Sequence, residues 1–293
     1  MRIYKKFNKK NKYTLANKDC KAFLQKMPSE IIDLTITSPP YYMGKDFDKS
    51  TKIEDFIDFH KEILTEVIRV TKDGGSICWQ VGYHVKNGTI IPLDFLIYEI
   101  MSNCKEVFLK NRIIWTFGHG LHGTKRFSGR HETILWYAKG REYYFDLESV
   151  RIPQKYPGKT FYKGAKKGLY SGNPNGKNPA DVWEIPNVKA NHIEKTMHPC
   201  QFPVALVQRL IRALSPKGGR IFDPFIGSGT TGVAAILESR NFVGCENNLK
   251  YYDLANERCK SALRAELRYR PLEKPILKPN PRMSVAVKPP NFK

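Results

Sequence analysis

The feature that most constrains the fold is a segment in the last third of the chain that passes from an apolar stretch through glycines into a helix-like stretch. It reads GRIFDPFIGSGTTGVAAILES, and residues Arg220 to Phe225 form its predicted buried strand. Glycines at a strand-to-helix turn let the backbone approach a nucleotide closely. Glu246 follows Gly227 by 19 positions, and an acid there can bind ribose hydroxyls. The segment therefore predicts an α/β fold that binds a nucleotide-like ligand.

The residues just before the glycines distinguish between two ligands. Glycine spacing alone is compatible with a nicotinamide dinucleotide or with S-adenosyl-L-methionine. The Asp223-Pro224 pair favours the second, because a carboxylate attracts a cationic amino-acid group and repels a pyrophosphate. We therefore expect S-adenosyl-L-methionine as the cofactor.

Other apolar runs indicate how the rest of the chain is organised. Buried strands are predicted at Ile31 to Thr37 and at Ser76 to Val81. Between them, residues from about 53 to 70 have apolar side chains at helical spacing, and Lys72 to Gly75 form a stop signal. This alternation predicts strand-helix-strand units and a mostly parallel sheet.

A second motif, TSPPYY from Thr37 to Tyr42, directly follows the first of these strands. Two successive prolines remove two N–H donors, so the chain leaves the sheet and its carbonyl groups have no ladder partners. Such carbonyls can accept hydrogen bonds from the amino group of a flipped base, and a tyrosine ring can lie against that base. If this strand neighbours the one ending at Asp223, cofactor and base meet at one edge of the sheet.

Residues 151–197 are rich in Pro, Gly, Asn and Lys and have no long apolar periodicity. Between residues 151 and 200, nine Lys or Arg face three acids, and five aromatic residues lie among them. Because cations meet phosphates and rings stack on bases, we expect a DNA-contacting insertion, with a solvated loop as the alternative. The net charge of the chain is +21, which also favours a nucleic-acid partner. The lysines expected to contact DNA are Lys155, Lys159, Lys163, Lys166 and Lys167.

Together, TSPPYY and FDPFIGSGTT resemble the signature motifs of the DNA amino-methyltransferases, which modify adenine N6 or cytosine N4. The motif order resembles the permuted beta class, which includes type II restriction-modification methylases. The resemblance implies a Rossmann-like S-adenosylmethionine-dependent methyltransferase fold, α/β, with a mostly parallel sheet, helices on both faces and circularly permuted motif order. It implies a catalytic half at 1–150, a target-recognition insertion at 151–197, a cofactor-binding half at 198–270 and an extended basic tail at 271–293.

The resemblance also implies roles for individual residues. The stretch from Arg112 to Lys139 resembles the segment that lines the target-base side, and residues 198–203 resemble the stretch before the helix at the methionine end of the cofactor. Arg126 and His131 are further expected DNA contacts. The expected catalytic residues are Ser38, Pro39, Pro40 and Tyr41. The expected cofactor-binding residues are Asp19, Phe222, Asp223, Pro224, Gly227, Gly229, Thr230, Glu246 and Asn247.

Within this family, Ser38 favours cytosine N4 as the methylated position, and adenine N6 is the second candidate. Cys200 also matches a short element of the cytosine-C5 enzymes, but it lies on the wrong side of the glycines, so we expect a structural cysteine. Two further candidate functions are a nicotinamide-dependent oxidoreductase and a DNA-binding protein without activity. The oxidoreductase leaves TSPPYY and the basic insertion unexplained.

The remaining features concern partners and compartment. The six cysteines form no CxxC pair, and His119, His122 and His131 lack the spacing of a closed zinc site, so no metal is expected. The basic N-terminus has no apolar stretch after it, which predicts a cytoplasmic protein without membrane contact. Double-stranded DNA is the expected partner. A cognate restriction endonuclease and a homodimer are further partners that the resemblance allows.

Overall fold

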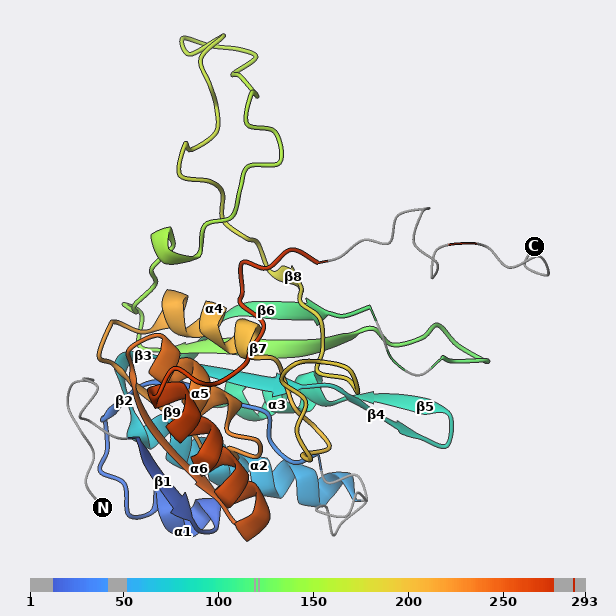
Figure 1. Ribbon diagram of the computed structural model, residues 1–293, viewed down its shortest axis with the longest axis vertical. Helices are drawn as coiled ribbons and strands as arrows, with labels where there is room; N and C mark the ends of the chain where they lie inside the picture. The colour runs from blue at the N-terminus through green and yellow to red at the C-terminus, as the bar shows by residue number, and fades with distance from the viewer. Residues whose placement is uncertain (1–12, 42–51, 119, 121, 277–286, 288–293) are drawn as a thin grey trace.

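The computed structural model describes residues 13–41, 52–118, 120, 122–276 and 287 (Figure 1). Tyr42 and His119, both part of the motifs discussed above, lie outside these residues. The helices are α1 (Cys20–Leu24), α2 (Ile53–Val70), α3 (Leu93–Ser102), α4 (Val204–Leu214), α5 (Thr230–Leu237), α6 (Leu249–Leu263) and the 3-10 helix η1 (Glu148–Val150). The strands of the main sheet, in spatial order, are β1 (Thr14–Asn17), β10 (Asn241–Glu246), β9 (Arg220–Asp223), β2 (Ile32–Thr37), β3 (Thr71–Val81), β7 (His131–Lys139), β6 (Val107–Thr116) and β8 (Val182–Glu184).

The main sheet is mostly parallel, as predicted. β7 runs antiparallel to its neighbours β3 and β6, and the other five pairings are parallel. Strands from the last third of the sequence, β9 and β10, lie between β1 and β2 from its beginning. The two predicted halves therefore share one sheet.

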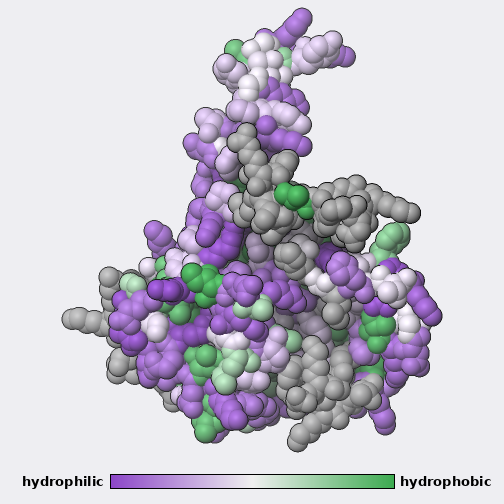
Figure 2. Space-filling model, turned by 45° about the vertical axis from the view of Figure 1, so that its right-hand side comes forward, coloured by the Kyte–Doolittle hydropathy of each residue, from purple (hydrophilic) through white to green (hydrophobic). Residues whose placement is uncertain are grey.

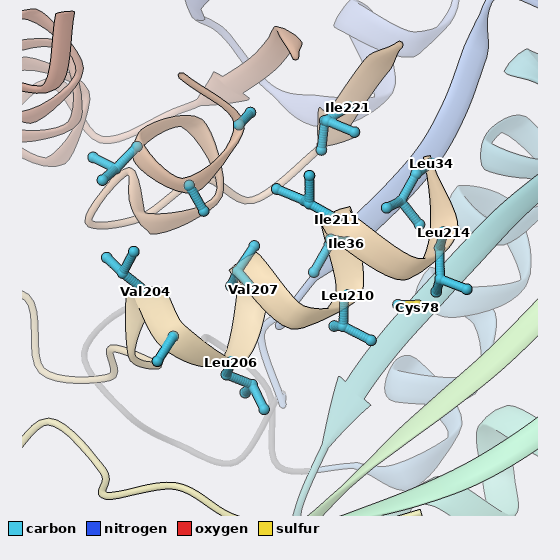
Figure 3. Close-up of a cluster of buried hydrophobic side chains, with 14 of the residues drawn as sticks. Leu34, Ile36, Cys78, Val204, Leu206, Val207, Leu210, Ile211, Leu214 and Ile221 are labelled. Carbon is cyan, nitrogen blue, oxygen red and sulfur yellow. The ribbon is translucent and has the colours of Figure 1, made fainter. Parts of the chain in front are cut away.

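Helices cover both faces of the sheet, which confirms the predicted layers (Figure 1). One face packs against α1, α2 and α3 and the other against α4, α5 and α6. Figure 3 shows the second face, where Val207, Ile211 and Leu214 of α4 lie near Leu34 and Ile36 of β2. Five of the six residues of β2 are buried, because both faces of this strand are covered.

The predicted helix at 53–70 is α2, but the stop signal after it is part of a strand. The chain passes from Val70 directly into β3, and the pairing of β2 with β3 shifts register between Ile32 and Leu34. A Cβ on Gly75 would lie 2.8 Å from Thr71 Cγ2 and 3.1 Å from the carbonyl oxygen of Asp33. The glycine is therefore needed where the two strands approach closely at this irregularity.

The predicted insertion at 151–197 contains two different structures. Residues 151–180, here called the arm, stand out from the body as a long loop (Figure 1). An antiparallel bridge between Ile152 and Lys177 closes its base, with N–H···O distances of 3.0 and 2.8 Å. Residues 182–184 are β8, which pairs with β6 and belongs to the main sheet. The part that projects is therefore shorter than the predicted insertion.

The first described residues pack on α6, and the segment around residue 273 packs on α4. Tyr13 Oη lies 3.0 Å from the Asn256 carbonyl oxygen and 2.6 Å from its Oδ1, which joins the start of β1 to α6. The predicted tail begins against α4, where Arg212 pairs with Glu273. From residue 277 onward that predicted tail lies outside the described residues, except for Val287.

Candidate active site

The two sequence motifs meet at neighbouring strand ends, as predicted. β2 and β9 pair in parallel, with Thr35 opposite Phe222. The hydroxyl of Thr37 donates a hydrogen bond of 2.6 Å to Asp223 Oδ1, although 186 positions separate the two residues. The TSPPYY turn and the glycine turn therefore leave the same edge of the sheet side by side.

Asp223 is an internal acceptor that binds both motifs. Its carboxylate also accepts hydrogen bonds from the hydroxyl of Thr231 at 2.6 Å and from the backbone N–H of Phe225 at 3.0 Å. The residue is 1% exposed, and burial raises the pKa of its carboxyl group to about 6. Asp223 is almost fully buried and does not line the pocket, so its carboxylate holds the turn together and does not lie where the sequence predicts that it meets the cofactor amine.

The glycine turn between β9 and α5 depends on backbone conformations and contacts that favour glycine. Gly227 and Gly229 have φ of +46° and +80°. A Cβ on Gly229 would lie 2.7 Å from Ala255 Cα in α6, and one on Gly227 would lie 2.9 Å from His198 Nε2. Arg258 of α6 donates a hydrogen bond of 2.6 Å to the Ser228 carbonyl. The turn is thus held closely against α6 and residue 198.

Glu246 ends β10 beside this turn. Its carboxylate accepts hydrogen bonds of 3.0 Å from the backbone N–H groups of Gly227 and Asn248. Burial raises the pKa of its carboxyl group above the usual range. The backbone N–H of Asn247 is a third donor to this carboxylate. A carboxylate has about four acceptor sites, so it can also accept from a ligand hydroxyl.

A pocket of about 620 Å³ lies between the two turns. All four predicted catalytic residues line it: Ser38, Pro39, Pro40 and Tyr41. Of the predicted cofactor residues, those on its wall are Gly227, Thr230, Glu246 and Asn247. The remaining five, Asp19, Phe222, Asp223, Pro224 and Gly229, are not on the wall.

Four of these five residues have contacts elsewhere, and the packing of Gly229 against α6 is given above. Asp19 Oδ1 accepts from the backbone N–H groups at the start of α1, and Phe222 stacks on Phe23 in the core with ring centroids 6.3 Å apart. The Pro224 carbonyl accepts from the thiol of Cys245. Asp19 lies near the cofactor edge, since the preceding Lys18 N–H donates to the Glu246 carbonyl at 2.9 Å.

The sequence reasoning missed several residues on the pocket wall. Gln80 lies within the buried run at the end of β3, and Tyr251 lies in the first turn of α6. The ring of His198, already singled out, packs edge-on against Tyr251 with centroids 4.4 Å apart, and burial lowers the pKa of its imidazole. No local motif marks Gln80 or Tyr251, because strand pairing and helix packing bring them to the pocket.

Comparison with known proteins identifies the family. The model of the N6/N4 DNA methylases matches residues 32–257, more than three quarters of the chain. The chain belongs to this DNA methylase family. It is 43% identical over 250 residues to the type II methyltransferase M.BglII of Bacillus subtilis, covering 85% of this chain and 69% of the relative. It is 33% identical over 258 residues to the DNA adenine methyltransferase YhdJ of Escherichia coli K12, covering 84% and 82%.

Solved structures agree on the fold of this DNA methylase. The cytosine-N4-specific PvuII DNA methyltransferase superposes with a TM-score of 0.68 at 20% identity, covering 91% of this chain and 96% of the other. The Thermus thermophilus protein TTHA0409, complexed with S-adenosyl-L-methionine, superposes with a TM-score of 0.62 at 26% identity, covering 86% and 94%. The predicted methyltransferase fold is confirmed.

The arm of the DNA methylase exposes the side chains that we expect to contact DNA. It carries seven Lys or Arg and no acid between residues 151 and 180. Figure 2 shows it as a mostly hydrophilic projection above the body. Tyr162 and Tyr170 on the arm are 82% and 74% exposed. The predicted DNA contacts on the arm and elsewhere are all exposed, namely Arg126, His131, Lys155, Lys159, Lys163, Lys166 and Lys167.

Cys200 lies in a different place from the one we expected. It is exposed on the pocket wall, whereas a structural cysteine would pack in the core as Cys78 and Cys259 do. His198 Nδ1 makes a close contact with the Cys200 carbonyl oxygen. Within the described part of the chain, no three His, Cys, Asp or Glu side chains gather as metal ligands. No helix in those same residues is both long enough and apolar enough to cross a membrane.

Proposed function

We propose that this DNA methylase transfers a methyl group from S-adenosyl-L-methionine to the N4 amine of cytosine in duplex DNA, at a specific sequence. The observation that carries this proposal is one pocket with Ser38 to Tyr41 on one side and Gly227 and Glu246 on the other. A base amine and a nucleoside cofactor would meet there. Type II methyltransferases among the relatives support a role as the modification enzyme of a restriction-modification system.

The glycine side of the pocket fits the cofactor. Bound there, S-adenosyl-L-methionine would supply an electrophilic sulfonium methyl group. Glu246 is placed to accept hydrogen bonds from ribose hydroxyls, with Asn247 beside it. His198 and Tyr251 close the same wall near Gly227. The closely packed turn keeps side chains out of the space that a nucleoside would occupy.

The TSPPYY side of the pocket fits a base that has left the duplex, because an amine in a stacked base pair cannot reach such a pocket. Ser38 Oγ and the Pro39 carbonyl would accept the two N–H bonds of the amine and orient its lone pair towards the methyl group. As the new N–C bond forms, the C–S bond breaks and the sulfur keeps the electron pair. The amine then releases one proton to solvent. Positioning is the main contribution of the protein.

The choice of cytosine rests on Ser38. The family more often has Ser at this position in cytosine enzymes and Asp or Asn in adenine enzymes. Adenine N6 is the second candidate, because the relative YhdJ is named as an adenine methyltransferase. Both bases present the same amine next to a ring nitrogen, so the hydrogen bonds at the turn suit either.

Methyl transfer to sequence-diverse duplex DNA tests the proposal. We expect tritium from labelled S-adenosyl-L-methionine to enter the DNA, and nuclease digestion followed by mass spectrometry to give N4-methylcytosine. Exclusive N6-methyladenine would refute the choice of cytosine and keep the reaction. No transfer to any sequence-diverse DNA would refute the reaction itself.

A further inference from the structure

We propose that Glu132 is a positioning residue that orients the catalytic turn through the side-chain amide of Gln80. The proposal rests on the function proposed above and adds to it two residues outside both signature motifs. Gln80 and Glu132 line the pocket beside Ser38 and Tyr41.

Strand pairing brings the two side chains together. β3 and β7 run antiparallel with Gln80 opposite Ile134, and Glu132 lies two positions from Ile134 along β7. Residues two apart in a strand share a face, so Glu132 is a diagonal neighbour of Gln80. Gln80 is only 3% exposed, so its amide must find its hydrogen-bond partners inside the protein or the pocket.

The chemistry of the carboxylate sets the direction of the hydrogen bonds. Gln80 Nε2 contacts Glu132 Oε2 and lies 3.2 Å from Tyr41 Oη. An ionised carboxylate only accepts, so Gln80 must turn its NH2 group towards Glu132. The same NH2 group then supplies a donor to the hydroxyl of Tyr41. Replacing the carboxylate with a neutral amide would let Gln80 present either end to Tyr41.

The Tyr41 hydroxyl passes this constraint on to the catalytic turn. This hydroxyl is hydrogen-bonded to the side chains of Ser38 and Gln80 and to the backbone of Gly82. Burial and the charge of Glu132 raise the pKa of Tyr41 well above its ordinary value, so the phenol keeps its proton at neutral pH. When the Tyr41 oxygen accepts a hydrogen bond from Gln80, the Tyr41 O–H must point away from Gln80. This limits the orientations that the neighbouring Ser38 O–H can adopt. The lone pair that receives the base amine is thereby oriented.

A double-mutant cycle tests the proposal in the full-length protein. The variants are Glu132→Gln, Gln80→Met and the double variant, each similar in size to the wild-type side chain. The control is Glu142→Gln, the same change of charge at an exposed residue just beyond the opposite end of β7 from Glu132. The measurements are kcat for methyl transfer to duplex DNA, the Kd of S-adenosyl-L-methionine by calorimetry and Tm.

We expect each single variant to lower kcat about tenfold or more, since small misplacements of reacting groups have large effects on rate. The double variant should lose no more than the worse single variant, because both changes break the same chain of hydrogen bonds. The cofactor Kd of all variants and the activity of Glu142→Gln should remain within about twofold of wild type, because these changes lie outside the cofactor contacts and Glu142 is an exposed surface residue.

If wild type and Glu132→Gln have the same kcat, this proposal is wrong and the proposed function is unaffected. The proposal is also wrong if the fold-losses of kcat in the two single variants multiply in the double variant. It is likewise wrong if weaker cofactor binding or a lower Tm explains the loss of kcat. A wild type unable to methylate duplex DNA would instead overturn the proposed function.

Discussion

Asp223 joins the two turns that form the pocket, and two substitutions test its hydrogen bonds and its proton binding. Alanine would leave the Thr37 and Thr231 hydroxyls and the Phe225 N–H without their acceptor in a buried site. We expect Asp223→Ala to cost at least about 2 kcal/mol of folding free energy, a typical effect of unsatisfied buried groups. Cofactor affinity should fall about tenfold or more as the turn loosens. Calorimetry that finds unchanged affinity in Asp223→Ala would contradict this role.

Asparagine at the same position keeps the shape and removes the charge, which gives a prediction on pH. Burial raises the folded pKa of Asp223 to about 6, above its value of about 3.9 in an unfolded chain, so the folded protein binds the proton more tightly. The stabilisation is complete below about pH 4 and is lost as the pH rises through about 6. The Tm of wild type relative to Asp223→Asn should therefore rise as the pH falls from 7 to 5. If the Tm of wild type and the Tm of Asp223→Asn change with pH in the same way, Asp223 does not bind a proton more tightly in the folded protein.

Residue patterns predicted that the turns after Thr37 and Asp223 lie at one edge of the sheet if their strands are neighbours, because parallel strands end at the same edge. The hydrogen bond between the two side chains was not predicted. They did not predict the pairing of Gln80 with Glu132, which depends on the register of two antiparallel strands far apart in sequence. A signal was present but unused for the hairpin of β4 (Tyr83–Lys86) and β5 (Thr89–Pro92). Its turn is Asn87-Gly88, with both φ values positive, which is a strong hairpin sequence.

Among the elements, the arm has the clearest separable function. Its lysines are exposed and have no acidic neighbours in the arm sequence, so we expect them to contact DNA phosphates. Replacing Lys163, Lys166 and Lys167 with Gln should weaken DNA binding and reduce the slope of log K against log salt by about 2 to 3. Cofactor affinity should not change. Fluorescence anisotropy over a salt series measures the slope.

The matched control removes three exposed lysines at the turns before β2, β6 and β9. These turns lie where the strands begin, at the edge of the sheet opposite the pocket. Lys26, Lys105 and Lys217 are those residues, and their replacement with Gln changes the net charge equally. We expect a smaller change in slope for the control. Equal slopes for the two triple variants would indicate that the general charge of +21, and not the arm, binds DNA.

Element prediction succeeded for long periodic segments and failed for short ones. α2 was found because its 18 residues carry a clear apolar face. β8 has three residues and an exposed side chain on each side of Trp183, so its pattern is indistinguishable from a loop. Only its pairing with β6 makes it a strand, and that pairing is not encoded locally. The predicted insertion at 151–197 therefore includes a strand of the main sheet that its sequence does not reveal.

For the whole molecule, the hydrogen bond of Tyr13 to Asn256 has a consequence for how genes of this kind can be rearranged. It places the start of β1 on α6, so a short linker from residue 264, just after α6, to residue 13 would join the two elements. This linker removes residues 265–276 and their pairing of Glu273 with Arg212. New ends could open at Gly164, an exposed position in the arm that makes no core contact. Such a reordered chain should bind S-adenosyl-L-methionine with a Kd within about threefold of wild type, since it keeps every contact of the pocket. Loss of binding in a folded reordered chain would show that gene order, and not strand adjacency alone, limits how this pocket can be assembled.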